Sequence, residues 1–119
     1  MILIANIAVV LVALLHLYFL VLEMFLWTKP YGIHTFDLTP EFANKSKNLA
    51  ANQGLYNGFL AAGLLWALFS ADGFEFKVFF LGCVVVAGLF GGLTVGRKIL
   101  WVQALPGVIA LGLVLLGGH

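Results

Sequence analysis

Four long apolar stretches, separated by short polar segments, dominate the pattern of the chain. They run over residues 2–27, 49–69, 78–95 and 99–117. A helix rises about 1.5 Å per residue, so about 20 apolar residues are needed to cross a hydrocarbon core of about 30 Å. The pattern therefore predicts an all-α integral membrane bundle of four antiparallel transmembrane helices, forming a single domain over residues 1–119.

Turn and cap residues refine the ends of these helices. Lys29-Pro30-Tyr31-Gly32 predicts a turn that stops the first helix, because proline restricts the residue before it. Thr39-Pro40-Glu41 predicts an N-cap followed by a proline at the first helical position, so the second helix should begin near Pro40. In the last stretch, Pro106 has no backbone N–H to donate, and a kink is expected near Val102.

The composition supports a membrane protein. Apolar residues make up 63% of the chain and charged residues 9%, whereas soluble domains have roughly 45–50% and roughly 25%. This balance excludes a soluble enzyme, a disordered protein and a nucleic-acid binder, and it makes membrane lipids the expected surroundings. The first stretch is not expected to be a cleaved signal peptide, because no basic residue precedes it and it ends in Glu23 and Trp27.

The basic residues are distributed unevenly between the connections. Five flank the first and third connections: Lys29, Lys45, Lys47, Arg97 and Lys98. Only Lys77 lies at the second connection. Cytoplasmic loops carry an excess of lysine and arginine, so the first and third connections should face the cytoplasm and both termini the outside of an inner or plasma membrane.

Two stripes of small residues recur at intervals of four on the predicted helices. They consist of Gly54, Gly58 and Ala62, and of Gly88, Gly92 and Gly96. Small residues let helix backbones approach closely in lipid, where the hydrophobic drive between helices is weak. The stripes predict packing within one bundle, with a homo-oligomer contact through Gly54 and Gly58, or through Gly88 and Gly92, as the alternative.

Polar side chains inside the stretches are costly in lipid, so each one is a candidate for a site. Most of them are expected near the cytoplasmic face: Glu23, Asn52, Gln53, Tyr56, Asn57, Arg97 and Gln103. Their convergence predicts a cytoplasm-facing polar pocket that binds or helps to carry a small amphipathic molecule. A purely structural network of hydrogen bonds between helices is the alternative.

His16 adds a further alternative. It precedes Glu23 by seven residues, which places the two within about 20° on one helix face and about 10 Å apart along the axis. A proton pathway through both residues would fit this spacing. No metal site is expected, because no further histidine, cysteine or acid stands at ligand spacing to His16. These residues do not call for a resident cofactor.

Several segments resemble a bacterial family known as domain of unknown function 1304. They are Leu22–Trp27, Leu49–Gly63, Phe80–Cys83 and Arg97–Gln103. The resemblance covers essentially the whole chain and is most specific between Asn52 and Gly58. It implies a small four-helix membrane protein and no particular activity.

A weaker resemblance is to the membrane-associated eicosanoid and glutathione metabolism family. It rests on Asn52 and Tyr56, followed by an apolar run that ends in Trp66; Leu55 stands where that family's motif has an acid. This resemblance implies a glutathione- or thiol-dependent enzyme. Arg97 would then activate a thiol or bind a carboxylate.

Overall fold

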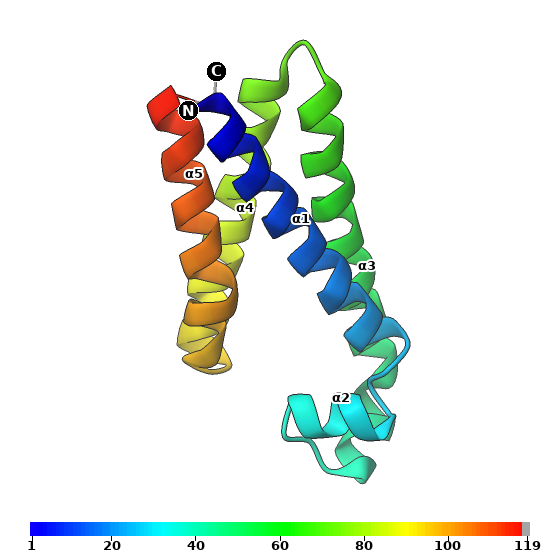
Figure 1. Ribbon diagram of the computed structural model, residues 1–119. Coiled ribbons are helices and arrows are strands. Elements are labelled where there is room, and N and C mark those ends of the chain that lie inside the picture. Colours follow the sequence, from blue (N-terminus) through cyan, green and yellow to red (C-terminus); the bar gives the residue numbers. More distant parts are fainter. Residues whose placement is uncertain (118–119) are drawn as a thin grey trace. The chain divides into compact units, whose positions relative to one another are not determined.

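A computed structural model describes residues 1–117 and is built from helices, with no strand among those residues. The predicted all-α class is confirmed. The elements, in chain order, are α1 (Ile2–Met24), α2 (Pro30–Thr35), α3 (Pro40–Phe69), α4 (Gly73–Thr94), the π-helical turn η1 (Leu100–Ala104) and α5 (Leu105–Gly117) (Figure 1).

Three helical segments are long and apolar enough to cross a membrane. They are α1, α4 and the segment Leu100–Gly117, in which η1 continues into α5. Helix α3 is not among them, because polar residues such as Asn52, Gln53 and Asn57 interrupt its apolar character. The structure thus indicates a membrane protein with three candidate spans.

The chain forms two compact units. The first contains residues 1–13 and the chain from Leu60 onward, and the second contains residues 14–59. Helices α1 and α3 each contribute residues to both units.

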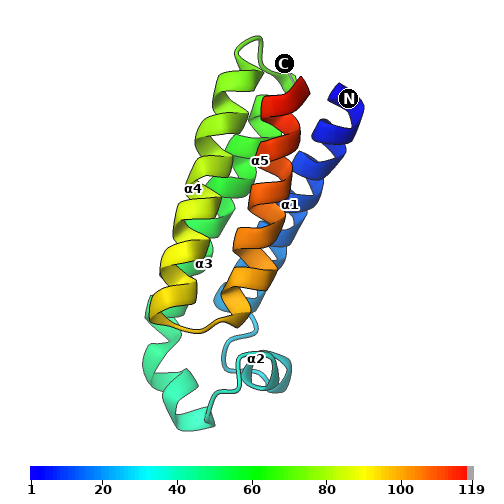
Figure 2. The ribbon, with the colours of Figure 1, turned by 90° about the vertical axis from the view of Figure 1, so that its left-hand side faces the viewer.

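The first unit has an apolar core of small and branched side chains. Its fully buried residues come from α1, α3, α4 and α5, and include Ala5, Val9, Ala61, Leu64, Leu81, Val84, Ala110 and Val114. Within this unit α4 and α5 lie side by side in both views (Figures 1 and 2). Large apolar side chains such as Phe90, Leu93 and Leu116 are exposed, as expected where lipid takes the place of water.

The last candidate span begins with a π-helical turn. The backbone N–H of Leu105 donates to the carbonyl of Leu100, five residues earlier, which is the π pattern. Pro106 lacks the N–H that an α-helix would direct at the Val102 carbonyl. A π turn thus lies where the kink near Val102 is predicted, and the kink itself stays a prediction.

The π turn packs closely on α4 at Gly88. A Cβ atom at Gly88 would lie 2.8 Å from the backbone nitrogen of Ala104, so only glycine lets the two backbones approach this far. Next to Ala104, the side chain of Gln103 donates from Nε2 to the carbonyl of Val84 on α4, at 3.1 Å. Gly92 makes a further close contact with Leu100, whereas a Cβ at Gly96 would meet nothing within 4 Å. Two of the three glycines of this stripe thus pack within the chain, and the homo-oligomer alternative stays a prediction.

The second unit contains the end of α1, the helix α2 and the first half of α3. Here the predicted turn at Lys29-Pro30-Tyr31-Gly32 is wrong, because Pro30 begins α2. The fixed φ of proline suits the first position of a helix as well as a turn. Gly32 is buried against the backbone of Leu26, which leaves no room for a side chain.

Helix α3 begins at Pro40, as predicted. Thr39 Oγ1 accepts a hydrogen bond from the backbone N–H of Phe42 at 3.1 Å, which is the expected N-cap bond. The indole Nε1 of Trp27 donates to Ser46 Oγ at 3.0 Å, and Ser46 Oγ donates to the Phe42 carbonyl at 2.7 Å. These bonds fasten the segment after α1 to the first turns of α3.

Replacing Gly88 by alanine tests the contact between α4 and η1. We expect Gly88→Ala to lower the free energy of unfolding by about 1–3 kcal/mol, because its methyl group overfills a close-packed site. Gly82→Ala on the same helix is the matched control, because a Cβ there meets nothing within 4 Å and alanine favours a helix by about 1 kcal/mol. Unfolding of the two variants by SDS titration in mixed micelles measures the difference; equal effects would contradict the close contact.

Candidate functional site

Glu23 and Asn57 form a hydrogen-bonded pair within the second unit. Glu23 lies in the last turn of α1, and Asn57 lies on α3. The side-chain Nδ2 of Asn57 donates to Glu23 Oε1 at 2.5 Å. Asn57 is only 8% exposed, whereas Glu23 is half-buried and so remains accessible. Two of the predicted site residues are thus brought together.

Glycines on α3 allow this pair to form. A Cβ at Gly54 would lie 2.7 Å from Met24 Cγ and 3.1 Å from Glu23 Cβ. Gly58 makes a similar contact with the side chain of Leu20. Because Gly54 and Asn57 are three residues apart, the face of α3 that carries the amide is also the face that approaches α1. The homo-oligomer alternative for this stripe stays a prediction.

Glu23 has no basic side chain as an ion-pair partner among residues 1–117. The ion pair found in that part of the chain joins Lys45 and Glu41 at 3.7 Å, both exposed on the first turns of α3. An ionised carboxylate without a counter-charge is costly in apolar surroundings. The amide of Asn57 satisfies one oxygen of Glu23 and supplies no opposite charge.

The other predicted residues of α3 are not buried with Asn57. Asn52, Gln53 and Tyr56 are exposed, and the Tyr56 ring lies edge-on to Phe59 with 5.7 Å between centroids. Three- and four-residue spacings group Gln53, Tyr56 and Asn57 on one side of a helix, but Asn57 alone of these is buried.

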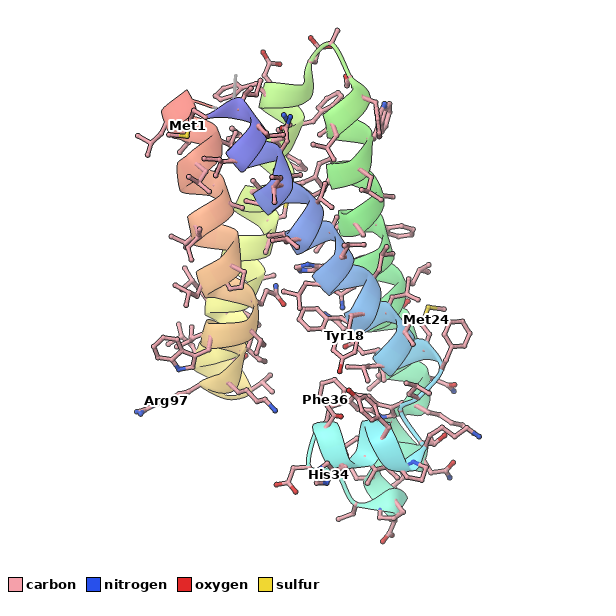
Figure 3. All side chains as sticks on the ribbon, viewed as in Figure 1. Met1, Tyr18, Met24, His34, Phe36 and Arg97 are labelled. Carbon is pink, nitrogen blue, oxygen red and sulfur yellow. The ribbon has the colours of Figure 1, made fainter. Side chains whose placement is uncertain are left out.

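His16 is fully buried on α1, where its ring lies edge-on to that of Phe19 with 5.2 Å between centroids. Two residues after it on α1 lies Tyr18, which Figure 3 labels; its hydroxyl group is hydrogen-bonded to that of Tyr31 on α2 at 2.5 Å. The proton pathway through His16 and Glu23 stays a prediction.

Arg97 and Gln103 belong to the first unit. Arg97 is exposed in the connection between α4 and η1, and its side chain points away from both elements (Figure 3). Gln103 donates to Val84, as described above. The role implied for Arg97 in binding glutathione or activating a thiol stays a prediction.

A second polar pair, between the buried Lys77 and the half-buried Asn6, was not predicted from the sequence. Lys77 is only 5% exposed, and its Nζ donates to Asn6 Oδ1 on α1 at 2.8 Å. The sequence places Lys77 in a connection, but α4 already begins at Gly73. Its spacing of four and seven residues from the buried Leu81 and Val84 was the available signal.

Two shallow grooves lie on the first unit. One runs along α4 past Gly82, Cys83 and Val86, and the other is lined by Glu75 and by the aromatic rings of Trp66, Phe76, Phe79 and Phe80. Neither groove includes a residue of the predicted polar cluster. Their apolar linings are suited to contact with lipid.

Comparison with known proteins identifies a family and a relative of similar length. The model of a family described as Protein of unknown function (DUF1304) matches residues 10–115. A protein of Lactococcus lactis subsp. lactis (strain IL1403), called Uncharacterized protein YpaA, is 33% identical over 104 residues, which is 85% of this chain and 87% of the relative. No solved structure matches the chain. The family range includes Glu23, Asn57 and Lys77, whereas Asn6 precedes it.

The bond between Glu23 and Asn57 can be measured by a double-mutant cycle. Asn57→Ala should lower the free energy of unfolding by about 1–3 kcal/mol, because it leaves a half-buried carboxylate without its donor. Combined with Glu23→Ala, it should give a coupling energy of about 0.5–2 kcal/mol.

The control for this cycle is the exposed pair of Glu41 and Lys45, for which alanine substitutions should give a coupling energy below about 0.5 kcal/mol. Both cycles can be measured by SDS titration. A coupling between Glu23 and Asn57 no larger than that of the control would show that their bond contributes little.

The contribution of the hydrogen bond between Asn6 and Lys77 to stability can be tested separately. Asn6→Leu should lower the free energy of unfolding by about 1–3 kcal/mol, because the buried ammonium group loses its acceptor. Adding Lys77→Met should restore most of this loss, because it removes the charge that needs the acceptor. If the double variant is no more stable than Asn6→Leu alone in the same titration, the loss has another origin.

Proposed function

The chain belongs to the family Protein of unknown function (DUF1304), and from its own residues we propose that it binds, or helps to carry, a small amphipathic molecule in the membrane. The observation that carries this proposal is the pair of Glu23 and Asn57. A half-buried carboxylate in the last turn of an apolar helix has an amide as its hydrogen-bond donor and no ion-pair partner among residues 1–117.

The surroundings of the pair suit a ligand with a polar and an apolar part. Binding sites for small molecules combine a mostly apolar lining with a few placed polar groups. Here Glu23 supplies an accessible polar group, and exposed apolar side chains such as Leu55 and Phe59 are present on the same unit. The exposed amides of Asn52 and Gln53 add hydrogen-bonding groups near the start of the apolar half of α3.

We place this site at the cytoplasmic face of a four-span bundle with both termini outside the cell membrane. Helix α3 has 30 residues, or about 45 Å, so its residues 49–69, about 31 Å long, can serve as the fourth span while its polar first turns extend beyond a hydrocarbon core of about 30 Å. Five basic residues flank the connections on the proposed cytoplasmic side. Lys77, at the other side, is buried, which strengthens the asymmetry of exposed positive charge.

A neutral fluorescent amphiphile, N-phenyl-1-naphthylamine, tests this function. We expect its fluorescence to rise saturably with protein purified in dodecylmaltoside, after the signal of empty micelles is subtracted. Asn57→Leu should weaken binding at least tenfold, because it removes the donor that holds Glu23. Asn48→Leu, at an exposed position of the same helix, is the matched control and should bind as the wild type does.

Two results would count against a binding site at the pair. One is a fluorescence rise that never saturates, which is simple partition into the protein–detergent particle. The other is equal weakening by Asn57→Leu and Asn48→Leu. In either case the pair of Glu23 and Asn57 would be a structural link between α1 and α3.

A further inference from the structure

We infer that the molecule bound at Glu23 is a lipophilic organic cation, such as an amphipathic ammonium or phosphonium compound. This inference rests on the proposed function and names the chemical class of its ligand.

The charge of the site supports a cation. Among residues 1–117, no lysine, arginine or histidine nitrogen forms an ion pair with Glu23. The hydrogen bond from Asn57 engages Oε1, whereas a carboxylate can accept about four hydrogen bonds. The attraction between opposite charges is stronger in apolar surroundings than in water, so a cationic ligand would gain most from this carboxylate and an anion would be repelled.

The side chains around Glu23 favour an organic cation over a metal ion. Magnesium and calcium require about six or more oxygen ligands. The group that Asn57 directs at Glu23 is its NH₂ donor, and none of the described residues forms a cluster of three or more histidine, cysteine or acidic side chains that could hold a metal. An organic cation needs a counter-charge and apolar contact, and it does not need a shell of oxygens.

An aromatic side chain can supply part of that contact. Phe19 lies four residues before Glu23 on α1 and is half-buried, and residues four apart share one face of a helix. The face of an aromatic ring attracts a desolvated cation, including quaternary ammonium groups. Glu23 and Phe19 thus lie on the same side of α1, where the Phe19 ring also packs beside the rings of His16 and Tyr18.

A pair of ions with matched shape and opposite charge tests the inference. Tetraphenylphosphonium and tetraphenylborate both carry four phenyl rings on one central atom. Each is used to displace N-phenyl-1-naphthylamine from the purified protein in dodecylmaltoside. We expect the cation to displace the fluorophore at a concentration at least tenfold lower than the anion, a difference of about 1.4 kcal/mol.

Three variants locate the charge selectivity. Glu23→Gln should abolish the preference for the cation, and Glu23→Asp should keep it. Glu41→Gln removes an exposed carboxylate on α3, and its preference between the two ions should equal that of the wild type. If Glu23→Gln does not fold, the inference is still tested by whether the wild type and Glu23→Asp prefer the cation to the anion.

The outcomes separate this inference from the proposed function. Saturable fluorophore binding with equal displacement by both ions, or with preference for the anion, overturns the cationic ligand and leaves the binding site in place. An unchanged preference in Glu23→Gln also overturns it. Absence of saturable fluorophore binding overturns the binding site and this inference together.

Discussion

The structure depends on the close approach of helix backbones at small residues. Moving an apolar side chain from lipid to a contact between helices changes its free energy little. Helices in a membrane are therefore held together by close packing and by hydrogen bonds between them. At Gly88 the backbone of η1 comes within reach of α4, and at Gly54 the side chains of α1 fill the space above α3. Both places also carry a side-chain hydrogen bond, from Gln103 in the first and from Asn57 in the second. Polar bonds form where glycine brings the helices together.

Each unit also contains a buried or half-buried charged side chain whose partner is an amide. In the second unit Glu23 accepts from Asn57, and in the first unit Lys77 donates to Asn6. An amide can complete a hydrogen bond but carries no opposite charge. Neither Glu23 nor Lys77 has an ion-pair partner among the described residues. Lys77 is only 5% exposed, whereas the half-buried Glu23 can be reached by a ligand.

Local signals explain what could be predicted from the sequence. The N-cap at Thr39 follows from the hydrogen-bonding group of a single residue and is present. The missing N–H of Pro106 marks the segment in which the π turn occurs. The buried face of each helix was harder to predict. Spacing shows which residues share a side of a helix, but it does not show which side packs against another helix. Asn57 is buried while Gln53 is exposed, and only the contact with α1 decides this. Lys77 was missed because α4 begins before its apolar run does.

The π turn sets the rotation of α5 about its own axis. It holds one residue more than the α-helical turn it replaces, and a residue corresponds to about 100° of rotation. Gly107, Ala110 and Val114 are buried, and their rotational position about the axis of α5 depends on that extra residue. Losing one residue from this segment would rotate the buried stripe of α5 out of the first unit without changing any side chain in it. The length of the segment, and not just its composition, is thus part of the information that specifies the fold.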